Sequence, residues 1–142
     1  MSVQELGKKV TFVNPVPVKG RDIAIELARR NPSTQFLFVV CWQLKSEDKQ
    51  SMLTSIENLP NIEWSNRVSD MGKIYFLARV LLVPSQWEEA WVRVATEAQF
   101  SGIPVLASDI GALPESVGNG GMLIEPNDID AWEIALQNIW ND

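Results

Sequence analysis

Residues 80–115 read VLLVPSQWEEAWVRVATEAQFSGIPVLASDIGALPE and hold the clearest structural pattern in the chain. The stretch opens with an apolar run that ends at Pro84-Ser85. A pattern of apolar residues at helical spacing follows and stops at Gly102, and a second apolar run occupies residues 104–107. A strand, a helix and another strand in this order predict a crossover unit with two parallel strands. Two carboxylates, Glu89 and Glu97, lie in the connection with seven residues between them.

The rest of the chain continues this alternation in both directions. Apolar segments predict further strands at residues 10–13, 35–41, 61–65 and 121–124. Helical spacing predicts further helices that contain residues 23–28, 52–56, 71–78, 113–117 and 129–140. The predicted N-caps are Ser46, Ser69 and either Asn127 or Asp128.

Six strands alternating with helices indicate an α/β, Rossmann-like fold, a doubly wound parallel six-stranded sheet with helices on both faces. The expected strand order is 3-2-1-4-5-6, so the first and fourth strands are neighbours. Connections leave these two strands in opposite directions and open a crevice at their carboxyl ends. The loop after the first strand carries Lys19, and the loop after the fourth carries residues 85–92. The two loops are therefore predicted to meet where open α/β sheets bind ligands.

The composition narrows the classes of function. The 142 residues, 46% of them hydrophobic, suit one domain at residues 9–142, and the polar residues 1–8 are expected to be a tail or linker. A net charge of −6 argues against a nucleic-acid partner. The chain has no histidine, which excludes zinc sites with histidine ligands and histidine general bases within it. Its one cysteine, Cys41, cannot form an internal disulfide. Without a signal-like segment or an apolar run of ~18 residues, we expect no membrane span and a cytoplasmic location.

The central stretch resembles the donor-binding signature of the group 1 (family four) retaining glycosyltransferases, which have the GT-B fold. That signature places Glu-x7-Glu between two parallel strands and follows it with a Gly-x-x-Pro-Glu turn. The matching pieces here are Glu89, Glu97 and residues 111–115, set in the wider pattern PSxWxEAW…EAxxxGxPVLASDxGALPE. The resemblance extends from about Val10 to Trp140. It implies the C-terminal, donor-binding domain of such an enzyme.

The residues of the crevice predict a site for a diphosphate. The helix after Glu89 is expected to begin near residues 90–92, with its free N–H groups and partial positive charge facing the crevice. Lys19 would add a full positive charge from the neighbouring loop, and the resemblance implies this role through the family's Lys-Gly lysine. The alternative for Lys19 is a solvated surface lysine.

The resemblance also implies roles for the two glutamates. Glu97 lies about two helical turns, on the order of 10 Å, beyond the helix start, which suits the ribose of the same nucleotide. The family's second glutamate accepts hydrogen bonds from the ribose hydroxyls. Its first glutamate binds hexose hydroxyls and stabilises the developing oxocarbenium charge, so Glu89 and Lys19 are the predicted catalytic residues. The alternative for Glu97 is a glutamate on the helix face that is paired or solvated. The alternative for Glu89 is a simple charge at the N-terminus of the helix.

Further donor contacts are implied by position. The family binds the base with the loop after its third strand, which here comprises Ser65, Asn66, Arg67 and Val68. Arg67 would either stack on the base or be solvated. Trp91 would either contact the donor or pack within the protein. The sequence leaves both choices open. The predicted donor-binding set is completed by Asn14, Ala90, Val92 and Arg93.

Two positions depart from the family pattern. The family usually has an arginine five residues before its lysine, and this chain has Asn14. It often has a glycine three residues after the first glutamate, where the main chain approaches the donor, and this chain has Val92. We hypothesise that Arg93 restores part of the missing charge. An Arg93→Ala variant that binds nucleoside diphosphate as well as the parent would contradict this.

The resemblance therefore implies the donor-binding half of a retaining hexosyltransferase that uses a nucleotide-diphosphate-sugar, a UDP-sugar or a GDP-sugar. The resemblance implies that an N-terminal domain absent from this chain holds the acceptor, so this chain alone is expected to be inactive. It also implies transfer without a metal ion or other cofactor. The apolar rim, with Trp132 or Trp140, is a candidate surface for the absent domain, and the core is the other place that suits these tryptophans.

Three alternatives remain open. The first is a catalytically degenerate nucleotide-binding or interaction domain, which Asn14 and Val92 support. The second is a sugar-nucleotide epimerase or phosphorylase relative, although no sequence context argues for a lysine-bound pyridoxal phosphate. The third is a receiver- or flavodoxin-like signalling domain, although the first strand ends in Val13-Asn14-Pro15 and not in an acidic cluster.

Overall fold

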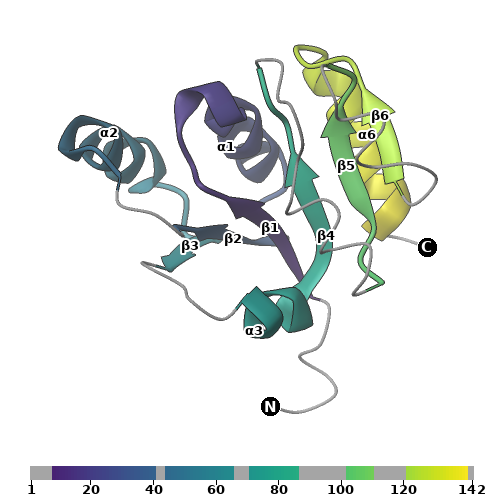
Figure 1. The fold of residues 1–142 in the computed structure, drawn as a ribbon, viewed down its shortest axis with the longest axis horizontal. Coiled ribbons are helices and arrows are strands. Elements are labelled where there is room, and N and C mark those ends of the chain that lie inside the picture. The colour runs from purple at the N-terminus through teal and green to yellow at the C-terminus, as the bar shows by residue number, and fades with distance from the viewer. Residues whose placement is uncertain (1–7, 41–43, 66–70, 87–101, 111–120, 141–142) are drawn as a thin grey trace.

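The computed structural model describes residues 8–40, 44–65, 71–86, 102–110 and 121–140, which form a six-stranded sheet (Figure 1). The strands are β1 (Lys9–Val13), β2 (Gln35–Val39), β3 (Ile62–Ser65), β4 (Ala78–Val83), β5 (Val105–Ser108) and β6 (Gly121–Ile124). All neighbouring strands are parallel, and their order is β3-β2-β1-β4-β5-β6. The doubly wound order predicted from the sequence is confirmed.

Helices cover both faces of this sheet. The described helices are α1 (Arg21–Arg30), α2 (Ser46–Ile56), α3 (Met71–Leu77) and α6 (Ile129–Trp140), with a 3-10 turn, η2 (Pro17–Lys19). Buried residues of α1, α2 and α6 share one apolar cluster with alternate strand residues, such as Phe12. Buried residues of α3 share a second cluster with the intervening strand residues, such as Val13. The two-residue period of the strands thus places one core on each face.

The core beneath α1 and α6 contains the largest buried side chains. Trp132 of α6 is fully buried, and its indole nitrogen donates a hydrogen bond of 3.1 Å to the backbone oxygen of Glu125. Phe12 and Phe38 meet edge to face, with ring centroids 5.2 Å apart. Trp132 is therefore no surface for another domain, because it lies on the stripe of α6 that faces the sheet. The structure thus assigns Trp132 to the core, one of the two places that the sequence left open, and corrects the suggestion that it is surface for the absent domain.

The other tryptophan of α6 has a different environment. Trp140 is half-buried, and the guanidinium of Arg79 lies over its ring, 5.0 Å from the centroid. The same guanidinium donates a hydrogen bond of 2.7 Å to the backbone oxygen of Trp140. The end of α6 is thus attached to the start of β4, where Arg79 lies.

Two helix boundaries differ from the prediction. Ser46 was expected to cap α2, but it is the first helical residue, and Lys45 holds the cap position without a side-chain hydrogen bond. Glu47 and Asp48 in the first turn stabilise the positive end of the helix electrostatically, so a hydroxyl cap is not required. Ala78 was expected in α3, but it begins β4 and pairs with Lys9, because the helix runs directly into the strand.

The predicted cap of the last helix is confirmed for Asp128. Its Oδ1 accepts a hydrogen bond of 3.1 Å from the backbone N–H of Ala131, as expected for a residue just before α6.

The strands predicted at residues 35–41 and 61–65 are slightly shorter, at Gln35–Val39 and Ile62–Ser65. The cap at Ser69 and the helices predicted after Glu89 and at residues 113–117 lie outside the described residues.

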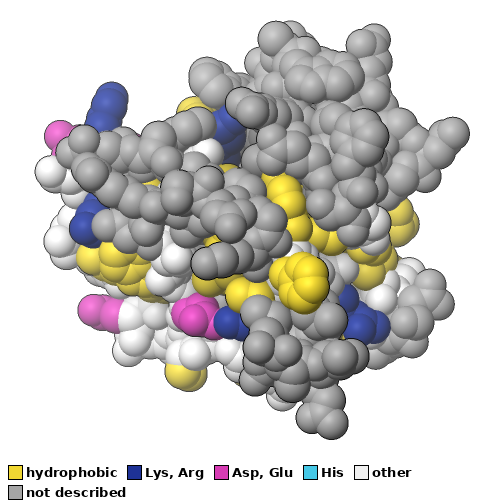
Figure 2. All heavy atoms as spheres, turned by 60° about the horizontal axis from the view of Figure 1, so that its bottom comes forward, with side chains coloured by type: hydrophobic (Ala, Val, Ile, Leu, Met, Phe, Trp, Pro, Cys, Tyr) yellow, Lys and Arg dark blue, Asp and Glu magenta, His cyan; other side chains and the backbone are white. Residues whose placement is uncertain are grey.

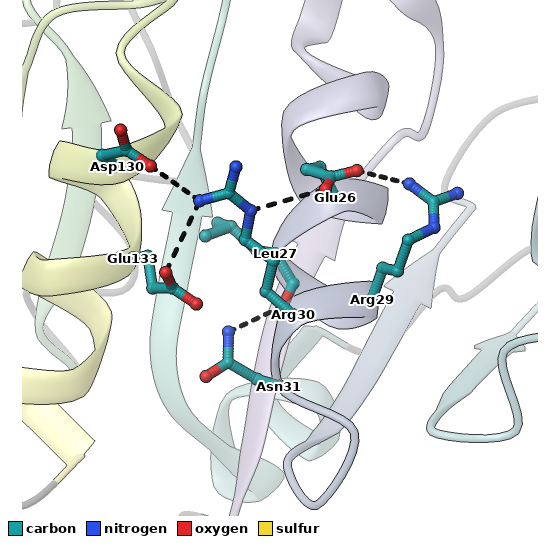
Figure 3. A network of polar contacts seen from close by, with 7 residues as sticks. All are labelled: Glu26, Leu27, Arg29, Arg30, Asn31, Asp130 and Glu133. Carbon is teal, nitrogen blue, oxygen red and sulfur yellow. Dashed lines mark hydrogen bonds and ion pairs between the residues drawn. The ribbon is translucent and has the colours of Figure 1, made fainter.

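An exposed cluster of ion pairs joins α1 to α6 (Figure 3). Arg30 donates a hydrogen bond of 2.7 Å to Asp130, and its guanidinium lies 3.5 Å from Glu133 and 3.4 Å from Glu26. Glu26 also pairs with Arg29 on the same helix. The hydrogen bond to Asp130 is the main cause that raises the pKa of Arg30.

Some apolar side chains reach the surface. Figure 2 shows several on the face that comes forward from the bottom of Figure 1. Phe76 of α3 and Ile134 of α6 are each 59% exposed, and Met122 and Leu123 of β6 are also exposed. Single exposed apolar residues are common on protein surfaces and do not by themselves define an interface. Among the described helices, none has the length and apolar character to cross a membrane.

Candidate functional site

The loops after β1 and β4 touch at the carboxyl end of the sheet. Gly20 lies so close to Pro84 that a Cβ on the glycine would stand 1.9 Å from the proline's backbone oxygen. The backbone N–H of Gln86 donates a hydrogen bond of 2.9 Å to the backbone oxygen of Val18. Because β1 and β4 are adjacent and parallel, this contact lies at the point where the connections diverge, which is where the sequence predicts a crevice. The predicted meeting of the two loops is confirmed.

Asn14 turns the chain out of the sheet directly after β1. Its φ angle of 59° lies in the left-handed region, which asparagine tolerates better than most residues. Its backbone N–H donates a hydrogen bond of 2.6 Å to Val39, and its backbone oxygen accepts one of 2.8 Å from Val16. The residue is buried, with 8% of its surface exposed. Asn14 therefore has a structural role directly after the carboxyl end of β1, where the sequence predicts the crevice.

Lys19 ends the short turn η2 next to the contact with β4. The backbone N–H of Lys19 donates to the backbone oxygen of Val16 at 3.0 Å, and that of Gly20 donates to Pro17 at 3.0 Å. Gly20 has a φ of 91°, which a glycine adopts without strain, and α1 begins at the next residue. Lys19 is half-buried and lies at the centre of the sheet rather than at its far edge. It is the one Lys or Arg among residues 14–20 and 84–86.

Ser65 lies at the same, carboxyl end of the sheet, where it is the last residue of β3. Its backbone oxygen accepts a hydrogen bond of 2.9 Å from Val40, which follows β2. Two strand spacings, about 10 Å, separate β3 from β1. The predicted base-binding position and Lys19 therefore lie at the same, carboxyl end of the sheet, on strands two positions apart.

The other predicted site residues lie outside the described residues. They are Asn66, Arg67, Val68, Glu89, Ala90, Trp91, Val92, Arg93 and Glu97. Their placement remains a prediction, and so does the course of the helix after Glu89. Of the predicted set, the structure brings Asn14 and Lys19 together at the β1–β4 crevice and places Ser65 two strands away.

Two residues of this edge were not predicted from the sequence. Gln86 donates hydrogen bonds from its side chain to the backbone oxygens of Pro84 and Pro126, each at 3.1 Å. Arg21, the first residue of α1, is buried and donates to the backbone oxygen of Asp48 at 3.1 Å. It also donates to Ser51 Oγ at 3.0 Å, so its charge is directed at α2. No sequence pattern near either residue predicts its role. Apart from Pro84, the groups that the two side chains contact are 27 or more positions away in the chain.

The described residues offer no metal site. No group of three or more His, Cys, Asp or Glu side chains in the described ranges could hold a metal ion. The chemistry available in the described part of this site is that of one lysine and of backbone N–H and carbonyl groups. A single cation beside main-chain groups suits the binding of an anion.

Comparisons with known proteins agree with this geometry. A family model described as "Glycosyl transferases group 1" matches residues 6–142. A D-inositol 3-phosphate glycosyltransferase from Corynebacterium aurimucosum is 31% identical over 149 residues, in a match that covers 95% of this chain. That match covers 35% of the relative, so the chain spans about a third of its length.

Two solved structures share the fold. A glycosyltransferase from Rickettsia africae superposes with a TM-score of 0.86 at 20% identity, over 95% of this chain and 38% of the other. Anabaena HepE in complex with UDP-glucose superposes with a TM-score of 0.84 at 21% identity, over 96% of this chain and 40% of the other. At these identities the likeness establishes the fold. The six-stranded parallel sheet is therefore that of one domain within larger glycosyltransferases.

Proposed function

The chain belongs to the group 1 glycosyl transferase family, and we propose that it is the part of such an enzyme that binds a nucleotide-diphosphate-sugar donor. The observation that carries the proposal is the contact between the loop with Lys19 and the loop after β4. This contact forms at the crevice where parallel α/β sheets bind nucleotides. The fold shared with HepE, which was solved with UDP-glucose, supports the same donor class.

Lys19 would bind the diphosphate of this donor. The chain has a net charge of −6, so a diphosphate needs a local cation. Lys19 is half-buried at the crevice, where a charge-assisted hydrogen bond to phosphate is stronger than in open water. The same contact would stabilise the diphosphate as it leaves the sugar.

Glu89 and Glu97 would bind the remainder of the donor. In this proposal Glu97 accepts hydrogen bonds from the ribose hydroxyls, and Glu89 binds the hexose and stabilises its developing positive charge. Ser65 and the three residues that follow it would bind the base. The sugar would pass to an acceptor held by a separate domain, with retention at the anomeric carbon and without a metal ion.

The proposal is tested by titrating the chain with UDP, GDP and ADP, with calorimetry or NMR as the readout. We expect one of these nucleotides, UDP or GDP first, to bind. Lys19→Ala should weaken that binding by at least about tenfold, the usual cost of a lost hydrogen bond to a charged group. Lys8→Ala is the matched control, because Lys8 is an exposed lysine that precedes β1 at the opposite end of the sheet. Failure to bind any of the three nucleotides would contradict the proposal.

The roles of the two acids are separated by comparing UDP with UDP-glucose, or GDP with GDP-mannose. Glu89→Gln should weaken binding of the nucleotide-sugar and leave the free nucleotide unchanged, because the predicted contact is with the hexose. Glu97→Gln should weaken both ligands alike. The opposite pattern would exchange the two roles.

A catalytically degenerate binding domain is the second candidate. The observation in its favour is Asn14, which is buried in the left-handed conformation at a position where the family usually has an arginine. Its amide cannot supply the missing charge. A parent chain that binds the nucleotide, but no nucleotide-sugar more tightly, would favour this candidate.

A further inference from the structure

Gln86 contacts the loops that follow three strands at the carboxyl end of the sheet, β1, β4 and β6. Its Nε2 donates hydrogen bonds of 3.1 Å to the backbone oxygens of both Pro84 and Pro126. Its backbone N–H donates one of 2.9 Å to the backbone oxygen of Val18. The three acceptors follow β4, β6 and β1, respectively, and Pro126 is 40 positions from Gln86 in the chain.

The two side-chain hydrogen bonds of Gln86 bring the loops after β4 and β6 together at the carboxyl end of β5. The strand β5 lies between β4 and β6, so the ends of these outer strands are about 10 Å apart. The backbone oxygens of Pro84 and Pro126 share one nitrogen and so lie within about 6 Å of each other. The loops after β4 and β6 therefore converge over the end of β5, where Ser108 is fully buried.

A glutamine suits this position because both partners are acceptors. A side-chain amide has two N–H donors, which match the two carbonyl oxygens. Carbonyl groups that lose such partners inside a protein are costly. With its side chain fixed, Gln86 holds its own N–H in place to bond Val18, the residue before Lys19.

We propose that Gln86 is a positioning residue of the donor site, which sets where Lys19 stands at the carboxyl ends of β1 and β4. The inference rests on the proposed function, because it concerns the same crevice. Gln86 acts on the donor through Lys19, by the chain of contacts from Pro84 and Pro126 to Gln86 and from Gln86 to Val18.

The test uses Gln86→Met, which keeps the length of the side chain and removes its donors without adding charge. Affinity is measured for whichever of UDP, GDP and ADP the parent binds most tightly. We expect binding about tenfold weaker, the usual effect of losing such hydrogen bonds. In a Lys19→Ala background the same change should weaken binding less than about threefold, because no lysine is left to misplace. Gln50→Met is the matched control, since Gln50 is exposed and its hydrogen bond within the described residues goes to Thr54 on its own helix.

Equal losses in the two backgrounds, or unchanged affinity in Gln86→Met, would overturn the inference. Amide hydrogen exchange provides a readout that does not depend on nucleotide. The N–H of position 86, which is bonded to Val18 in the parent, should exchange faster in the variant. If the parent binds none of the three nucleotides, the proposed function fails, and unchanged protection at position 86 would then overturn the inference separately.

Discussion

Two junctions bring distant parts of this chain together, and they are built in opposite ways. At the carboxyl end of the sheet, main chain meets main chain, with Gly20 against Pro84 and the N–H of Gln86 bonded to Val18. Between α1 and α6, long charged side chains meet at the surface around Arg30 (Figure 3). The first junction leaves no space for one more carbon atom. At the second, the side chain of Asp130 is 80% exposed.

The difference shows which contacts hold the fold. Main-chain atoms cannot move aside by changing rotamer, so a close backbone contact tolerates no added volume. Exposed ion pairs are screened by water and salt and contribute little. Beneath the ion pairs, α6 is held by buried apolar residues such as Trp132 and Leu136. We expect substitutions at the two junctions to rank by burial and backbone contact, not by the number of polar contacts.

Trp132→Ala should have the largest effect and would show that the α1–α6 junction depends on its buried layer. We expect a loss of about 4 kcal/mol in the free energy of unfolding, from the cavity and the lost apolar burial. Urea denaturation followed by circular dichroism measures it. Trp140→Ala is the control, because that ring is half-buried and stacks on Arg79, and it should cost about 1 kcal/mol. Similar losses for both tryptophans would contradict the ranking.

Gly20→Ala should be next and tests the backbone contact at the crevice. The new Cβ would lie 1.9 Å from the backbone oxygen of Pro84, at a φ of 91° that alanine rarely adopts. We expect a loss of about 3 kcal/mol, from strain and from the displaced loop. Gly102→Ala separates the two causes, because Gly102 has a φ of 78° but open space around it. It should cost about 1 kcal/mol. Equal losses would mean that strain alone, not the contact, explains the effect.

Asp128→Ala should cost less, and it sharpens the comparison by removing one local contact of α6. The lost hydrogen bond to the N–H of Ala131 should lower the free energy of unfolding by about 1 kcal/mol. Asp128→Asn keeps an oxygen that can accept this bond and should come close to the parent. Thermal melts of the three proteins measure the difference. A large loss in the asparagine variant would assign the effect to charge and not to capping.

Arg30→Met should have the smallest effect, within the scatter of repeated thermal melts, although Arg30 contacts Asp130, Glu133 and Glu26. The reason is that Asp130 is exposed and that Glu133 and Glu26 are only half-buried, so water and salt reach these charges and screen them. Thermal melts at low and high salt provide the check, and the melting temperatures of variant and parent should agree within the scatter at both salt concentrations. A loss as large as that of Asp128→Ala would show that the ion pairs hold α6 after all.

Much of the fold was predictable because its signals are local or periodic. Buried strands flanked by helical spacing predicted the parallel sheet and its order, and Asp128 before the last helix predicted a cap that is confirmed. The meeting of the Lys19 loop with the loop after β4 followed from that order alone. The wrong assignments, Ser46 as a cap and Ala78 as helical, both concern element ends, where single residues carry weak signals.

The sequence by itself determined the family, the strand order and the position of Lys19 at the centre of the sheet, because hydrophobic periodicity and short motifs act over neighbouring residues. Only the tertiary structure decided that Gly20 has no room for a side chain, that Arg21 is directed at α2, and that Gln86 joins three loops. Their partners are main-chain atoms or side chains far away in the chain. Such contacts exist only once the strands have paired, so no spacing along the sequence can announce them.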